Sequence, residues 1–310
     1  MPHTIWTMTR KTAAGRGIKG GVLTLTFLLC LLSSGALLRG NDGYFTTYNH
    51  HVEKGELELM IMSDFTVPSS ANRNGGQNNY FSQMLELEYG VTDKYASELM
   101  IEAFQDVGGT VRFTGFRWEN RYSFFKENKW LNPVVYMEYE HLDYATRYKM
   151  EVSGWVRPPY EEEESSEPEK DERILETRLI LSHDFASTNV AFNWINETDL
   201  RGGLTDFGYS IGLMHKLGAS HHHAEGPDHE SGGAHAEHRG AGLAAVGVEL
   251  IGALGDSRRL ALRPRDQQHY LQPMVMFHLG KGWMLHTGAA VGLTPSSDRL
   301  LLRMALGFGL

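Results

Sequence analysis

The chain closes with Arg303-Met-Ala-Leu-Gly-Phe-Gly-Leu310. Large apolar side chains occupy alternate positions of this stretch, and arginine, alanine or glycine fills the positions between them. Successive side chains of a β-strand point to opposite faces, so an alternation with a period of two indicates a strand. The stretch therefore predicts a strand with one large apolar face and one small or polar face.

The same alternation recurs along most of the chain, while helical periodicity is nearly absent. Most of the alternating segments are about 9–14 residues long, which is the length a tilted strand needs to cross a bilayer. Strands of soluble domains are usually shorter, with a mode of about 5–6 residues. Twelve strands are predicted, near 54–66, 80–90, 95–106, 111–125, 133–146, 173–184, 188–197, 205–217, 241–253, 268–279, 283–293 and 299–310.

The connections between these segments alternate between short and long, as periplasmic turns and surface loops do in membrane barrels. If the first strand runs outward, both termini of the barrel lie on the periplasmic side. Two links break the rhythm, because 107–109 is short where a long loop is expected and 218–240 is long where a turn is expected.

The closing octapeptide resembles the C-terminal targeting strand of Gram-negative outer-membrane β-barrels, with Ala305 where glycine is more usual. Across most of its length the chain resembles porin-like outer-membrane barrels in architecture. The resemblance implies an all-β fold, a transmembrane antiparallel up-and-down barrel of about 12 strands (range 10–14), over residues 54–310. It also implies outer-membrane lipid, lipopolysaccharide and the barrel assembly machinery as partners, with Phe308 and Leu310 as the assembly signal. A soluble β-sandwich remains the alternative fold, and the oligomeric state is open.

The N-terminus has the pattern of a secretory signal peptide over residues 1–36. A basic stretch without acids precedes an apolar run at 22–32, and Ser34 and Ala36 form a small-x-small cleavage site. The run is too short for a transmembrane helix, which needs roughly 20 residues. Cleavage removes Cys30, the only cysteine, so no disulfide scaffold is expected. Residues 37–53 are predicted to be a periplasmic leader or a short plug.

Placing the apolar face toward lipid puts many charged side chains on the inner face. Eleven glutamates and four arginines are predicted to line the lumen: Glu56, Glu58, Glu86, Glu88, Glu98, Glu102, Glu119, Glu138, Glu140, Glu176 and Glu249, with Arg117, Arg121, Arg178 and Arg303. The surplus of acids favours an aqueous passage for small cationic solutes or metal ions. The alternative is a filled, non-conducting barrel of structural or adhesion type, in which carboxylates and arginines brace neighbouring strands and the loops bind a partner or a metal.

Two links have biased compositions. The link 218–240 carries six of the fifteen histidines, His221, His222, His223, His229, His235 and His238, among carboxylates. Such a flexible set of ligands suits loosely bound Zn, Cu or Ni, and the alternative is a solvated link without a metal. The loop 146–172 contains an acidic run and is predicted to be a solvated surface loop. No other cofactor is predicted.

The sequence gives little support for an enzyme. Ser182-His183-Asp184 contains the residue types of a catalytic triad, but adjacent strand residues point to opposite faces and cannot converge. No nucleophile elbow, phosphate loop, zinc-protease motif or dinucleotide fingerprint occurs. A barrel hydrolase is therefore the least favoured function. The net charge of −9 disfavours nucleic-acid binding.

Overall fold

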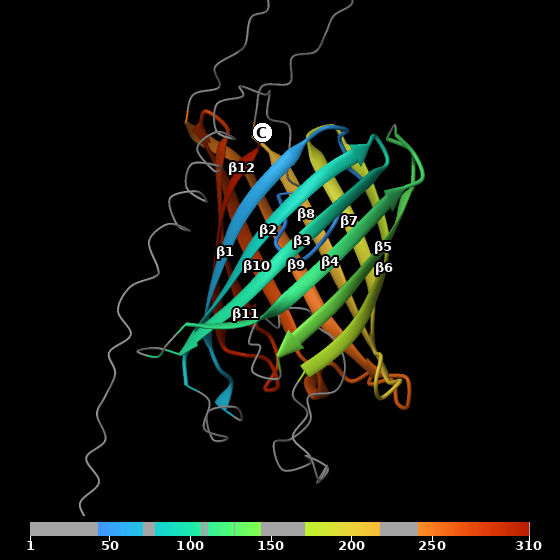
Figure 1. Cartoon of the computed structure of the whole chain (residues 1–310), viewed down its shortest axis with the longest axis vertical. Helices are drawn as coiled ribbons and strands as arrows, with labels where there is room; N and C mark the ends of the chain where they lie inside the picture. Colours follow the sequence, from blue (N-terminus) through green and yellow to red (C-terminus); the bar gives the residue numbers. More distant parts are fainter. Residues whose placement is uncertain are drawn as a thin grey trace, which may run out of the picture.

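The computed structural model describes residues 43–70, 78–106, 109, 111–126, 128–143, 171–217 and 241–309. These residues form a closed barrel in which each strand pairs with its sequence neighbours and the last strand pairs with the first (Figure 1). The strands are β1 (Leu57–Val67), β2 (Tyr80–Thr92), β3 (Tyr95–Asp106), β4 (Arg112–Ser123), β5 (Asn132–Asp143), β6 (Asp171–Phe185), β7 (Thr188–Asp199), β8 (Thr205–Lys216), β9 (Gly242–Asp256), β10 (His269–Gly280), β11 (Trp283–Gly292) and β12 (Leu300–Gly309). The predicted twelve-strand, all-β, up-and-down barrel is confirmed.

The outer surface of the barrel is apolar. Alternate residues of each strand are exposed, among them Ile61 (50%), Trp118 (53%) and Leu302 (47%), although they are large and hydrophobic. A soluble domain would bury such residues, whereas a barrel in a bilayer presents them to lipid. The closed fold with its apolar exterior is that of a Gram-negative outer-membrane protein. No helix in the described parts of the chain has the length and apolar character that crossing a bilayer requires.

The strands are inclined to the long axis of the barrel (Figure 1). We call the end where β1 begins and β12 ends the terminal end. Tight turns join β2 to β3, β6 to β7 and β10 to β11 at this end. In the last of these turns, Lys281 and Gly282 have φ angles of 49° and 92°, the positive values that match the twist of a two-residue hairpin. As predicted, the link between β3 and β4 is short and the link between β8 and β9 is long, against the alternation of the other links.

Several predicted segments lie outside the described residues: the signal peptide 1–36, almost all of the acidic loop 146–172, the histidine-rich link 218–240 and Leu310. Residues 37–53 are predicted to be a periplasmic leader or a short plug, and the structure describes 43–53 of them. Tyr44, Thr46 and Asn49 are buried inside the barrel, and Glu53 is exposed at the terminal end.

Candidate functional site

The fifteen charged residues predicted to line the lumen all lie on the inner face. Glu56 precedes β1 by one residue, and the other fourteen alternate with lipid-facing side chains along their strands. Glu56, Glu86 and Glu88 are half-buried and the rest are buried. The buried ones are Glu58, Glu98, Glu102, Arg117, Glu119, Arg121, Glu138, Glu140, Glu176, Arg178, Glu249 and Arg303.

The pairing register aligns acidic residues from β1 to β9. Nine of them stand directly opposite one another across successive strands, and we call this set the acidic row: Glu58, Glu88, Glu98, Glu119, Glu138, Glu176, Glu197, Asp206 and Asp256. The row begins at the second residue of β1, at the terminal end, and finishes at the last residue of β9, at the opposite end. Because the strands are tilted, a row of direct neighbours climbs the barrel from one end to the other.

Carboxylates directly opposite one another repel, so the acidic row destabilises the sheet unless positive charge lies near it. Arg117 on β4 supplies part of that charge. Its side chain is buried and forms ion pairs with three carboxylates: Nε with Glu102, and Nη1 with Glu138 at 3.3 Å and Glu140 at 3.5 Å. One guanidinium therefore joins β3, β4 and β5 inside the lumen.

The other three arginines also pair with inner carboxylates. Arg121 pairs with Glu88 and, at 2.8 Å, with Glu119, and Arg178 pairs with Glu176. Arg303 Nε lies 2.9 Å from Oδ2 of Asp64, its register partner across the β1–β12 seam. The sequence reasoning missed Asp64, although it shares the inward parity of Glu58 and could have been found from that spacing. These ion pairs brace neighbouring strands, as the interpretation of a filled barrel requires.

Residues 43–53, called here the luminal segment, are held inside the barrel by Glu249 on β9. The backbone N–H groups of Phe45, Thr46 and Thr47 donate to the Glu249 carboxylate at 3.2, 3.0 and 2.6 Å. Gln272 adds a fourth hydrogen bond at 2.9 Å. Hydrogen bonds to a charged acceptor are stronger than neutral ones, so Glu249 is the main anchor of the segment.

Strand β7 holds the next part of the luminal segment through two asparagines. The Asn193 side chain accepts from the Tyr48 N–H and donates to the Tyr48 carbonyl, both at 2.8 Å, and so pairs with this residue as a strand would. The Tyr44 hydroxyl donates to Asn189 Oδ1 at 2.9 Å. Asn193 thereby satisfies the backbone N–H and carbonyl of Tyr48, and Asn189 satisfies the buried Tyr44 hydroxyl.

The arginines of the bracing network also contact the luminal segment. Arg121 and Arg178 lie over the Tyr48 ring at 4.9 and 5.0 Å, and Arg303 lies over the Phe45 ring at 4.9 Å. Arg178 also donates to the Thr46 carbonyl at 2.8 Å. The segment and the wall thus share one network, and removing the segment changes the surroundings of three luminal arginines.

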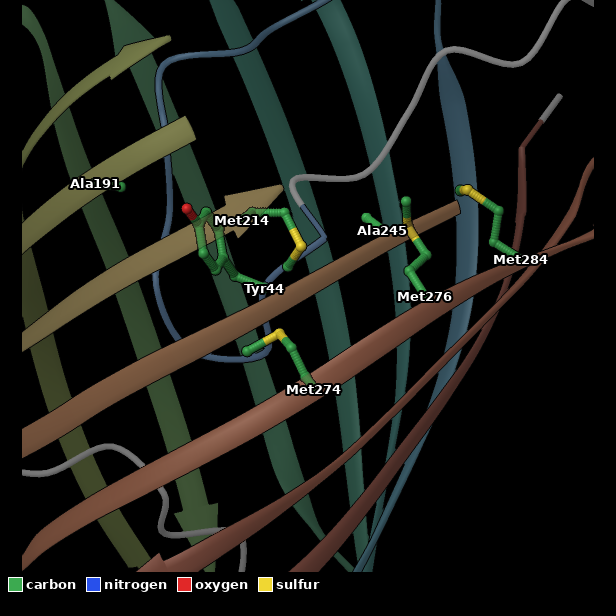
Figure 2. Close-up of a cluster of buried hydrophobic side chains, with 7 residues drawn as sticks. All are labelled: Tyr44, Ala191, Met214, Ala245, Met274, Met276 and Met284. Atoms are coloured by element: carbon green, nitrogen blue, oxygen red, sulfur yellow. The ribbon is translucent and has the colours of Figure 1, made fainter. Parts of the chain in front are cut away.

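Buried methionines fill the space between the luminal segment and the wall on the side of β8 to β11. Met214, Met274, Met276 and Met284 form an apolar cluster with Tyr44, and Figure 2 shows Met214 and Met274 beside the Tyr44 ring and the other two farther along the wall. Methionine is unbranched and flexible, and it fills irregular gaps well. The inner surface therefore has an apolar side as well as the acidic row.

Gly212 on β8 allows the Tyr44 ring to approach the wall. A Cβ at this position would lie 2.4 Å from Tyr44 Cε1, so the Gly212→Ala variant must push the ring aside and lose the hydrogen bond to Asn189. We expect a loss of about 1–3 kcal/mol in the free energy of unfolding, measured with denaturant in lipid vesicles. Gly242→Ala is the matched control, because a Cβ there meets nothing within 4 Å. Equal stability of the two variants would contradict this placement of Tyr44.

A depression of about 490 Å³ opens at the terminal end of the barrel. It is lined by the end of the luminal segment, the β2–β3 turn, the β4–β5 link and the ends of β6 and β8: His50, His51, Val52, Glu53, Lys54, Asp93, Phe125, Lys126, Asn128, Asp184 and Lys216. On its rim, a hydrogen bond from Lys126 Nζ at 2.9 Å holds the pKa of Asp93 below its usual value.

Ser182 and Asp184 share the inner face of β6, and His183 between them points outward, where its Nδ1 lies 2.6 Å from the Lys129 carbonyl. The three consecutive residues therefore do not converge. A different histidine meets the other two, because His50 Nδ1 lies 2.6 Å from Ser182 Oγ and His50 Nε2 lies 3.6 Å from Asp184. The Ser182 side chain is buried beneath these two residues of the depression.

No model of a protein family matches the chain, and no curated protein matches its sequence. Solved structures do match its fold. An outer-membrane channel from Pseudomonas putida F1 aligns with a TM-score of 0.51 at 10% identity, covering 88% of this chain and 100% of that one. At such low identity the match shows the barrel fold alone.

Two further structures align more loosely. The CymD monoaromatic hydrocarbon channel has a TM-score of 0.39 at 10% identity, with 83% of this chain and 88% of that chain covered. LpxR from Salmonella typhimurium has a TM-score of 0.35 at 11% identity, with 81% and 99% covered. Similarity of this degree adds nothing on function, so the function must be argued from the lumen itself.

Proposed function

We propose that this outer-membrane barrel gives passive passage to small cationic solutes, including metal ions, along a lumen narrowed by the luminal segment. The observation that carries the proposal is the acidic row. A negative surface in a channel of low dielectric walls raises the local concentration of cations and excludes anions.

The charge balance of the inner face also favours cations over anions. Among the positions named above, the predicted glutamates outnumber the arginines by eleven to four, and Asp64, Glu197, Asp206 and Asp256 increase the excess. Four arginines cannot neutralise these carboxylates one for one. Hydrated cations moving along the row would reduce the remaining repulsion between neighbouring strands.

The chief alternative is a barrel that does not conduct and whose links bind a partner. The bound luminal segment favours it, because Glu249, Asn193 and four arginine pairs already fill much of the lumen. The two functions differ in one measurable property, the ionic conductance of the purified protein. We also propose that the barrel has no catalytic role, and that lipid, lipopolysaccharide and the assembly machinery are its partners at the membrane.

Conductance in a planar bilayer under a potassium chloride gradient tests the proposal. We expect a reversal potential with the sign that marks potassium as the preferred ion. Changing Glu98, Glu119 and Glu138 to glutamine removes the middle of the acidic row, so the ratio of potassium to chloride permeability should fall several-fold.

Asp143→Asn is the control for this experiment. Asp143 lies on the outer face at the far end of β5 and its loss should leave the permeability ratio unchanged. A preference for chloride in the unaltered protein would overturn the proposal. Absence of current both from the unaltered protein and from a barrel without the luminal segment would support the non-conducting alternative.

A further inference from the structure

Two histidines and an aspartate meet at the depression of the terminal end. His50 and His51 belong to the luminal segment, and Asp184 is the penultimate residue of β6. The His51 Nε2 atom lies 2.7 Å from Asp184 Oδ2, and the His50 Nε2 atom lies 3.6 Å from the same oxygen. One ligand atom from each of the three residues falls within a mutual distance of 4.8 Å.

Adjacent residues of a regular strand could not place both rings on one carboxylate, because their side chains diverge. The chain bends at His50. The two imidazole rings consequently lie close together, with their centroids 4.5 Å apart. This local bend is the reason that consecutive histidines can act as a pair.

Neighbouring groups hold the three side chains in place. Ser182 Oγ lies 2.6 Å from His50 Nδ1, which leaves Nε2 as the ring atom directed at Asp184. Asn189 donates to Asp184 Oδ1 at 2.6 Å, which leaves Oδ2 for the histidines. Metal-binding histidines and carboxylates are oriented in this manner, by hydrogen bonds to their second nitrogen or oxygen.

We propose that His50, His51 and Asp184 form a binding site for a divalent transition metal ion of the zinc class. Two imidazole nitrogens and one carboxylate oxygen suit zinc, copper or nickel, whereas magnesium and calcium prefer oxygen ligands alone. His51 and Asp184 are partly exposed, with side-chain exposures of 34% and 26%, so an ion can enter from the depression. Three protein ligands leave a fourth position of a tetrahedral ion for water or solute.

A bound ion would join the luminal segment to β6 and so fix the segment at the terminal end. The proposal does not depend on ion conduction, because metal binding is measured on the purified barrel without a membrane current. It is also separate from metal binding by the link 218–240, whose histidines lie in another part of the sequence.

The test uses the full-length mature protein, folded in detergent and free of any affinity tag that contains histidine. In the reference protein, the six histidines of the link are replaced by asparagine. Competition with a chromophoric chelator then measures zinc, and we expect one zinc ion per barrel. Comparison with the natural chain measures how much additional zinc the link itself binds.

Substitutions in the reference protein locate the ion. We expect at least a tenfold loss of zinc affinity for His50→Asn with His51→Asn and for Asp184→Asn. Ser182→Ala should weaken binding by about 10-fold to 100-fold, the usual cost of removing a group that orients a ligand. His183→Asn and His141→Asn are matched controls, since His183 points outward and His141 faces Asp171 at the opposite end.

Cobalt(II) gives a readout that does not depend on the folding of the ligand variants. A site with two imidazole ligands, a carboxylate and one open position should give the visible absorption of four-coordinate cobalt in the reference protein. Zinc should then displace it one for one. No zinc bound at micromolar concentrations, or a zinc affinity unchanged both by His50→Asn with His51→Asn and by Asp184→Asn, would overturn the proposal.

Discussion

Deletion of residues 43–53 should raise the ionic conductance of the purified barrel several-fold. The luminal segment occupies the lumen and is bound to β7, β9 and the luminal arginines. Barrels of about eight strands are filled by their own side chains, while those of 16–18 strands enclose aqueous channels. In a barrel of intermediate size, an internal segment therefore decides how much of the lumen remains open.

The measurement compares single-channel currents of the natural and deleted proteins in the same salt, with a chelator present because the deletion also removes His50 and His51. Glu249→Gln is an intermediate variant, since it weakens the three backbone hydrogen bonds but leaves the segment in the chain. We expect its conductance to lie between the other two. Identical currents from a correctly folded deleted barrel would mean that the segment does not limit the passage.

The second large effect concerns stability. The Arg117→Met variant keeps the volume of the side chain but removes the positive charge shared by Glu102, Glu138 and Glu140. Removing one partner from a buried ion pair typically costs about 3–5 kcal/mol, because the remaining charges stay buried without compensation. We expect a loss of this size in the free energy of unfolding, measured with denaturant in lipid vesicles.

Arg173→Met is the matched control. Arg173 pairs with Asp171 at the far rim of the barrel, where its side chain is 49% exposed. Exposed pairs contribute only about 0–1 kcal/mol, so this variant should be nearly as stable as the natural protein. A loss below about 1 kcal/mol for Arg117→Met as well would show that the luminal carboxylates are neutral or reached by water.

The number of strands and their faces were predictable from the sequence because both are local properties. A strand of alternating residues has its faces fixed by the backbone, whatever it later pairs with. Hence Trp118 and Leu302 could be assigned to the lipid face, and Glu98, Arg117 and Glu176 to the lumen, before any pairing was known. The link lengths then indicated a closed antiparallel order.

The contacts among the inner residues were not predictable in the same way. The sequence indicated only that carboxylates and arginines of the inner face could brace neighbouring strands, and the structure pairs Arg117 with Glu102. It gave no sign that Arg121 would reach Glu88 on β2 or that Arg303 would meet Asp64 across the seam. A shift of one strand by two residues keeps every face and changes every partner, so only the closed barrel specifies the pairs.

The position of the luminal segment was likewise not predictable from the sequence. Its composition, with Tyr44, Tyr48, Asn49 and two histidines but no charge before Glu53, allowed a leader or a plug. Its position inside the barrel depends on contacts with Glu249 and Asn193, which lie some 145 to 204 residues further along the chain. Contacts at such separations leave no periodic signal in the sequence, because they exist only after the wall has closed.

The sequence by itself determined the long alternating strands and their apolar and acidic faces, since alternation and strand length are properties of the local backbone. The tertiary structure decided that nine acids align from end to end, that residues 43–53 enter the lumen, and that His50 and His51 meet Asp184. These features depend on register and closure, which are set by the packing of all strands together.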